Sequence, residues 1–137
     1  MTSKLERLRE MTTVVADTGD IEAVHRLRPV DCTTNPSIVL KALGGPNFEE
    51  TMNEAVAWGS RQNGGADARV AAVSDRLAVS VGAALAELVP GRVSTEVDAD
   101  LSFDVRGSIT RAEEIIKDYE ARQIPRDRIL VKLASTW

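Results

Sequence analysis

Residues 128–134 read Arg-Ile-Leu-Val-Lys-Leu-Ala, a short and mostly apolar run that begins three residues after Pro125. Aliphatic runs of this length, bounded by a helix-breaking residue, are typical of a strand buried in a parallel sheet. Strand alternation would place Leu130, Lys132 and Ala134 on one side of that sheet. The segment therefore predicts a strand, buried on both faces, that carries one charged side chain among apolar neighbours.

Three segments upstream have the same character. Residues 12–17, 30–34 and 92–96 are short and rich in valine and threonine, and glycine, proline or asparagine stands close to each. Residues typical of helix N-termini precede or separate these segments. They are the capping box of Ser3 and Glu6, and further capping residues whose side chains can accept a hydrogen bond from an amide in the first turn of a helix. The other predicted caps are Asp20, Asn35 followed by Pro36, and Asp104, and the longest helical pattern covers residues 67–89.

The resulting order is helix, strand, helix, strand, several helices, strand, helix, strand. Short strands that alternate with helices predict right-handed βαβ units and a parallel sheet, hence an α/β fold. Four strands make either a small open sheet or a segment of a barrel, and the pattern alone leaves both open. The 137 residues are roughly half of the ~250 that a complete (β/α)₈ barrel needs.

The composition excludes several classes of protein. The chain is 43% hydrophobic and 28% charged, which is typical of a globular domain and not of a disordered or collagen-like chain. The net charge of −4 argues against a nucleic-acid or anionic-membrane partner. One cysteine, Cys32, and one histidine, His25, exclude a disulfide framework and the usual zinc sites. With neither a secretory signal nor a long apolar stretch, we expect a cytoplasmic protein.

A polar side chain stands at or just after the carboxyl end of each predicted strand: Asp17, Asn35, Glu96 and Lys132. In parallel α/β sheets these ends meet at one edge, where binding and catalytic sites lie. We therefore expect the four groups to converge on one site.

Each of these groups has two interpretations. Apolar walls around Lys132 would favour its neutral amine, a nucleophile toward carbonyls, but the ammonium can also reach solvent or pair with Glu96. Asp17 and Glu96 can form a pair of carboxylates for proton transfer. Alternatively, Asp17 starts a turn at Thr18 and Gly19, and Glu96 only neutralises the lysine. Asn35 as a helix cap is compatible with a substrate-binding role.

Residues 12–20, 31–37, 93–98 and 129–137 resemble the N-terminal half of transaldolase, and the resemblance extends over residues 1–137. Its most specific parts are Thr-Thr-Asn-Pro-Ser at 33–37 and Val-Lys-Leu-Ala-Ser-Thr at 131–136. The resemblance implies a (β/α)₈ TIM-barrel family, of which residues 1–137 supply the first four strands and their helices as a single half barrel.

The resemblance also implies a reaction: cofactor-free and metal-free transfer of a dihydroxyacetone unit from sedoheptulose 7-phosphate or fructose 6-phosphate to an aldose phosphate, in the pentose phosphate pathway. Carried over by position, Lys132 would form the Schiff base and Asp17 would take the proton of the C4 hydroxyl. Glu96 would assist proton transfer through water, and Asn35 and Thr33 would bind the substrate.

The family's chain continues well past Trp137, and the arginines that hold the substrate phosphate lie in that part. We therefore expect the short chain to be weakly active or inactive alone. A truncation or an incomplete gene model would explain its length. Two open sheet edges predict self-association, pairing with a C-terminal half barrel, or an aggregation-prone fold. The alternatives are a non-catalytic half-barrel module and a class I aldolase-like enzyme without the phosphate site.

Overall fold

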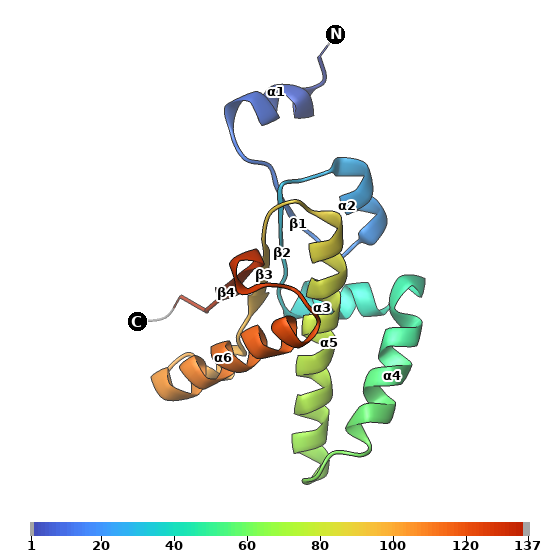
Figure 1. Cartoon of the computed structure of the whole chain (residues 1–137), viewed down its shortest axis with the longest axis vertical. Coiled ribbons are helices and arrows are strands. Elements are labelled where there is room, and N and C mark those ends of the chain that lie inside the picture. Colours follow the sequence, from blue (N-terminus) through green and yellow to red (C-terminus); the bar gives the residue numbers. More distant parts are fainter. Residues whose placement is uncertain (1, 136–137) are drawn as a thin grey trace.

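Four short strands form a parallel sheet in the order β1-β2-β3-β4 (Figure 1). The structure is a computed structural model that describes residues 2–135. Each strand pairs with the next one in the sequence, as in a (β/α) barrel. All four predicted strands are confirmed, with narrower bounds. They are β1 (Val15–Asp17), β2 (Asp31–Thr33), β3 (Val93–Glu96) and β4 (Ile129–Lys132).

At least one helix precedes each strand, and the four predicted N-terminal caps are confirmed. Asp20 accepts from the Ala23 amide and Asp104 from the Gly107 amide, while Ser3 and Glu6 form the capping box. The helices are α1 (Lys4–Met11), α2 (Ile21–Leu27), α3 (Pro36–Leu43), α4 (Glu49–Gly59), α5 (Ala66–Leu88) and α6 (Val105–Ala121). Short 3₁₀ turns are η1 (Pro46–Phe48), η2 (Ala99–Leu101) and η3 (Arg126–Arg128).

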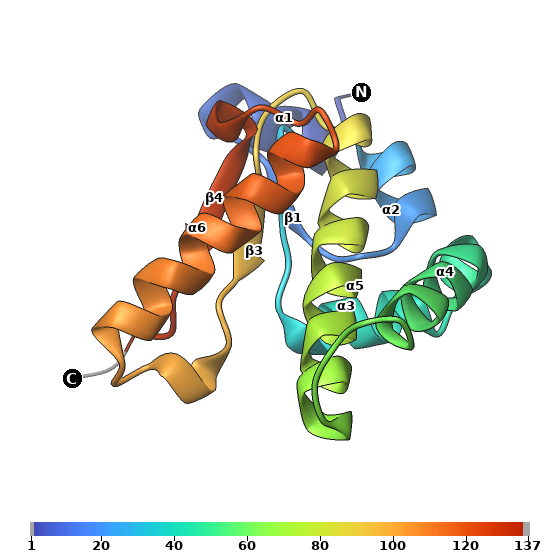
Figure 2. The same cartoon turned by 60° about the horizontal axis from the view of Figure 1, so that its bottom comes forward.

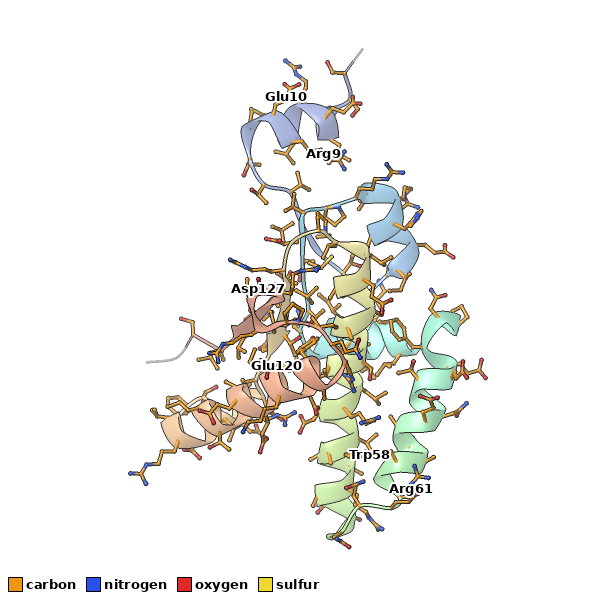
Figure 3. The ribbon with its side chains drawn as sticks, viewed as in Figure 1. Arg9, Glu10, Trp58, Arg61, Glu120 and Asp127 are labelled. Atoms are coloured by element: carbon orange, nitrogen blue, oxygen red, sulfur yellow. The ribbon has the colours of Figure 1, made fainter. Side chains whose placement is uncertain are left out.

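The helices α4 and α5 pack against each other beyond the end of the sheet, where Figure 3 shows Trp58 on α4. The Arg76 guanidinium lies 4.8 Å from the centre of the Trp58 ring, a cation–π contact. Trp58 therefore takes part in the packing of α4 against α5.

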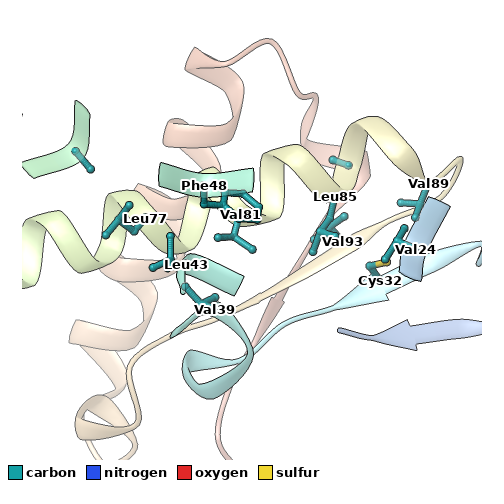
Figure 4. Close-up of a cluster of buried hydrophobic side chains, with 12 residues drawn as sticks. Val24, Cys32, Val39, Leu43, Phe48, Leu77, Val81, Leu85, Val89 and Val93 are labelled. Carbon is teal, nitrogen blue, oxygen red and sulfur yellow. The ribbon is translucent and has the colours of Figure 1, made fainter. Parts of the chain in front are cut away.

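The hydrophobic core fills one face of the sheet. In Figure 2, α5 and α6 lie in front of the strands and approach each other near one end, and α2 packs against α5. The close-up in Figure 4 shows the larger cluster, in which Leu85 of α5 and Val93 of β3 are fully buried. Cys32 belongs to this cluster, and burial raises the pKa of its thiol to about 11. A smaller cluster, around Ile115 and Tyr119, lies under α6.

The opposite face of the sheet is not covered by any helix of residues 2–135. Leu130 of β4 is 45% exposed there, and Leu133 is exposed just beyond the strand. The prediction that this strand is buried on both faces is therefore wrong. In a closed barrel the inner faces of other strands cover such side chains, and this sheet has four strands.

The sequence contains no apolar stretch long enough for a membrane-spanning helix, and the structure can be compared with that observation. Within residues 2–135, no helix has the length and apolar character needed to cross a bilayer.

Candidate active site

Three predicted site residues are the last residues of their strands: Asp17 of β1, Glu96 of β3 and Lys132 of β4. Because the strands are parallel, these ends lie at one edge of the sheet. The neighbouring Thr95 side chain bonds the Tyr119 hydroxyl of α6 at 2.5 Å, so it points to the helix-covered face. Glu96 therefore points to the open face.

Glu96 and Lys132 form an ion pair. They are register partners on β3 and β4, and the lysine Nζ lies 3.0 Å from Oε2 of the glutamate. The two side chains are 18% and 36% exposed. The sequence interpretation that surrounds Lys132 with apolar walls is thus wrong, since its nearest charged neighbour is a carboxylate and its face is open. The same contact places a proton acceptor beside the amine, which must lose a proton before it can attack a carbonyl.

Asp17 and Thr33 form a second pair, on β1 and β2. The Thr33 hydroxyl donates to Oδ1 of Asp17 at 2.6 Å, and the two residues are in register. The alternative in which the Asp17 side chain starts the following turn is not what the structure shows. In that turn it is the Thr18 hydroxyl that accepts a hydrogen bond, from the Asp20 amide at 3.1 Å. The Asp17 carboxylate is therefore held on the open face by a strand neighbour, and it remains exposed.

Asn35 lies two residues after β2, at the same edge of the sheet. Its Oδ1 accepts from the Ile38 amide at 2.9 Å, so the predicted role as N-cap of α3 is confirmed. Within residues 2–135 its amide nitrogen makes no recorded hydrogen bond, which leaves two donors for a ligand. No recorded hydrogen bond or ion pair in that range joins Asn35, the Asp17–Thr33 pair and the Glu96–Lys132 pair to one another.

Ser94 is a candidate residue that the sequence interpretation missed. It is the register partner of Thr33 on one side and of Leu130 on the other, and it is 5% exposed. Alternation along β3 puts it on the same face as Glu96, and this signal was present in the sequence. Ser94 therefore lies beside Thr33 and two residues before Glu96 on the same face.

The opposite face of β3 is anchored by a buried pair of hydroxyls. Thr95 and Tyr119 are both fully buried, and burial raises the pKa of the tyrosine to about 12. A Cβ on Gly82 of α5 would collide with the Tyr119 oxygen, so the glycine makes room for this contact. The strand that presents Glu96 is thus fixed from behind by α5 and α6.

The acidic residues after β3 have structural roles. Asp98 accepts from the Asp100 amide at 2.9 Å, and Asp104 caps α6. Asp98 is thus a loop residue, and the predicted role of Asp104 as a helix cap is confirmed. Among residues 2–135, no group of three or more His, Cys, Asp or Glu side chains is placed to hold a metal ion.

Comparison with known proteins gives the same assignment as the motifs. The family model described as transaldolase/fructose-6-phosphate aldolase matches residues 14–137. The chain belongs to this family. It is 74% identical to a transaldolase of Agrobacterium fabrum and 72% identical to one of Rhizobium etli, in each case over the whole chain and 43% of the relative. A transaldolase of Xanthomonas euvesicatoria is 53% identical over 98% of the chain and 42% of the relative.

The chain therefore spans less than half the length of these transaldolases. Its four consecutive parallel strands, each preceded by a helix, are consistent with the first half of the family's (β/α)₈ barrel. This agrees with the half-barrel architecture that the resemblance to transaldolase implied. The open face of the sheet corresponds to the interior of such a barrel.

Proposed function

We propose that this chain supplies the Schiff-base part of a transaldolase active site. The observation that carries the proposal is the position of the Lys132 Nζ. It lies 3.0 Å from the Glu96 carboxylate, at the same carboxyl end of the parallel strands as the Asp17–Thr33 pair. The substrates would be a ketose phosphate, sedoheptulose 7-phosphate or fructose 6-phosphate, and an acceptor aldose phosphate of the pentose phosphate pathway. We propose the cytoplasm as the compartment.

The first chemical step is imine formation. Lys132 passes a proton to Glu96, directly or through a water molecule, and the free amine attacks C2 of the ketose. Glu96 then returns the proton to the carbinolamine hydroxyl, which leaves as water. The product is a protonated imine between Nζ and C2. The protonated imine can accept an electron pair, so the step uses no cofactor.

The second step breaks the C3–C4 bond. Asp17 removes the proton of the C4 hydroxyl, C4 becomes the aldehyde of the departing aldose, and the bonding electrons move to the imine, which becomes an enamine. The Thr33 hydroxyl orients the Asp17 carboxylate for this step. The free amide donors of Asn35 bind the dihydroxyacetone part. Addition of the enamine to the acceptor aldehyde and hydrolysis of the imine complete the transfer.

Binding of the substrate phosphate needs more protein than the chain provides. The relatives are more than twice as long, and remote binding of a phosphate orients a sugar for reaction. We therefore propose that residues 1–137 form one half-barrel domain with little or no turnover alone. Its open face would be closed by a second copy or by a separate C-terminal half.

Trapping of the imine tests the proposal. The chain is incubated with fructose 6-phosphate and reduced with borohydride, and peptides are mapped by mass spectrometry. We expect a dihydroxyacetone adduct on Lys132. The Lys132→Ala variant should lose this adduct although it retains Lys4, Lys41 and Lys117. Absence of an adduct in a sample that circular dichroism shows to be folded would reject the enzymatic proposal in favour of a non-catalytic half-barrel module.

A second candidate is aldol cleavage without transfer, since the matching family also includes fructose-6-phosphate aldolase. The same lysine and Asp17 would serve both reactions. Release of glyceraldehyde 3-phosphate in the absence of an acceptor, followed with a coupled dehydrogenase assay, distinguishes them. Release that does not depend on erythrose 4-phosphate favours the aldolase, whereas an adduct that turns over only when the acceptor is added favours transaldolase.

A further inference from the structure

The Ser94 hydroxyl is a nearly buried polar group to which the proposed reaction gives no role. The residue lies within β3 and is 5% exposed. Among residues 2–135, its side chain makes no recorded hydrogen bond. A hydroxyl at this depth is nearly always hydrogen-bonded, because a buried polar group without a partner costs free energy. The Ser94 side chain should therefore have a partner on the face to which it points.

The contacts around Ser94 fix where this hydroxyl lies. Its neighbour Val93 packs in the core cluster of Figure 4. Its other neighbour, Thr95, bonds the Tyr119 hydroxyl at 2.5 Å. Both neighbours point to the helix-covered face, so alternation along the strand turns Ser94 to the open face. From β2, the hydroxyl and the amide of Thr34 both donate to the Ser94 carbonyl, at 2.8 and 3.0 Å. The main chain is thus held on both sides, and only the side chain can still rotate.

The neighbours of Ser94 on the open face decide which partner its hydroxyl can reach. Thr33 is its register partner on β2, and neighbouring strands lie about 4.8 Å apart. Glu96 is two residues further along β3, which is roughly 6.6 Å, and its carboxylate already pairs with Lys132. The register partner on β4 is Leu130, which has no polar side-chain atom. The geometry therefore favours the Thr33 hydroxyl.

The number of protons on the two hydroxyls sets the direction of this contact. A hydroxyl has one proton to donate and two lone pairs that can accept. Thr33 donates its proton to Oδ1 of Asp17 at 2.6 Å, so toward Ser94 its oxygen can only accept. Ser94 would then be the donor, and the series of hydrogen bonds would end on a carboxylate. Hydrogen bonds in such a series strengthen one another, and the bond to the charged group is the strongest.

We infer that Ser94 is a positioning residue: its hydroxyl donates to Thr33, directly or through one water molecule, and so keeps the Thr33 hydroxyl directed at Asp17. The inference rests on the proposed function, in which Asp17 takes the proton of the C4 hydroxyl. Ser94 contacts neither Lys132 nor the substrate in this role. Its loss should therefore leave imine formation intact and slow cleavage of the C3–C4 bond.

Borohydride trapping resolves the two steps on one lysine. After incubation with fructose 6-phosphate, the Lys132 peptide carries either the whole sugar phosphate skeleton, trapped before cleavage, or the dihydroxyacetone unit, trapped after it. With Ser94→Ala we expect unchanged total trapping. The ratio of cleaved to uncleaved adduct should fall about fivefold, the factor that corresponds to one neutral hydrogen bond. Ser74→Ala, an exposed position on α5, is the matched control and should change neither quantity. An unchanged ratio with Ser94→Ala overturns the inference.

A double-mutant cycle tests whether Ser94 acts through Thr33. Thr33→Val removes the acceptor, so addition of Ser94→Ala to that variant should lower the ratio of cleaved to uncleaved adduct no further. Such non-additivity would support the positioning role. If the two changes instead multiply, Ser94 acts independently of Thr33, as it would by binding the substrate itself, and the inference is wrong.

The same cycle measured on stability needs no substrate. Urea unfolding, followed by circular dichroism, compares the unsubstituted chain, the two single variants and the double variant. We expect Ser94→Ala to lower the unfolding midpoint in the unsubstituted chain but not in Thr33→Val, where the serine hydroxyl has already lost its acceptor. Additive shifts of the midpoint overturn the inference, whether or not an imine forms. Non-additive shifts without any Lys132 adduct would support the hydrogen bond from Ser94 to Thr33 and reject the proposed function instead.

Discussion

The two faces of the same sheet differ in what they hold. On the outer face, Leu85, Val93 and Tyr119 are fully buried under α5 and α6. On the inner face, the side chains of the Asp17–Thr33 and Glu96–Lys132 pairs are in part open to solvent. Alternate residues of one strand thus serve different purposes, since Thr95 anchors β3 to a helix and Glu96 faces the candidate site. Stability should depend on the outer face and chemistry on the inner one.

Truncation of one leucine on each face gives the largest contrast. Leu85→Ala removes a fully buried side chain of α5, and we expect it to lower the free energy of unfolding by about 2–5 kcal/mol. Leu130→Ala removes a half-exposed side chain of β4 and should cost less than about 1 kcal/mol. Urea unfolding of both variants, followed by circular dichroism at a fixed protein concentration, measures the difference.

Equal losses of unfolding free energy in the two variants would contradict this division of roles between the two faces of the sheet. A loss with Leu130→Ala that exceeds the loss with Leu85→Ala would contradict it as well.

Alkaline pH should weaken the outer face selectively. Burial raises the pKa of Tyr119 from 10.0 to about 12, so between these values the folded chain keeps a proton that the unfolded chain has lost. Stability therefore falls as pH rises from 10 to 12, by up to about 2–3 kcal/mol for a shift of this size. Tyr119→Phe should be less stable at pH 8, where Thr95 loses its partner, but its stability should fall less steeply above pH 10. A slope that Tyr119→Phe leaves unchanged would assign the alkaline loss to other groups.

The sequence was sufficient for features that depend on neighbours in the chain. The caps Asp20, Asn35 and Asp104 were predicted because each bonds an amide three residues ahead. The position of Lys132 at a strand end was predicted for a similar reason, since Pro125 and the aliphatic run delimit the strand. The family was identified from two short motifs, which the comparison confirms.

Features that depend on strand register could not be predicted from the sequence in the same way. The hydrogen bond from Thr33 to Asp17, and the position of Ser94 beside Thr33, follow from which residues are paired across β1, β2 and β3. Pairing of strands far apart in the sequence is set by how the helices pack. The exposure of Leu130 depends on what lies over the inner face, and periodicity along one strand carries no information about that.

Removal of the Thr33 hydroxyl should have a modest effect on stability. Thr33→Val keeps the shape of the side chain but deletes the hydrogen bond to Asp17, and we expect a loss of about 1 kcal/mol or less at this partly open site. Imine formation should proceed as before, because Lys132 is untouched. Carbon–carbon cleavage should slow several-fold, since the carboxylate is less well oriented. Borohydride trapping of the imine that still carries the whole fructose 6-phosphate skeleton, and release of the aldose phosphate, measured in parallel, separate the two steps.

The smallest effect on stability is expected at Glu96, where the effect on chemistry should be large. Glu96→Gln replaces the partner of Lys132 with a neutral amide; the pair is partly exposed, so its loss should change the free energy of unfolding by less than about 1 kcal/mol. The amine would lose its proton acceptor, and the rate of borohydride trapping with fructose 6-phosphate should fall at least tenfold. Glu54→Gln, an exposed position on α4, is the control for loss of one carboxylate. Unchanged trapping with Glu96→Gln would show that the 3.0 Å contact neutralises the lysine without serving imine formation.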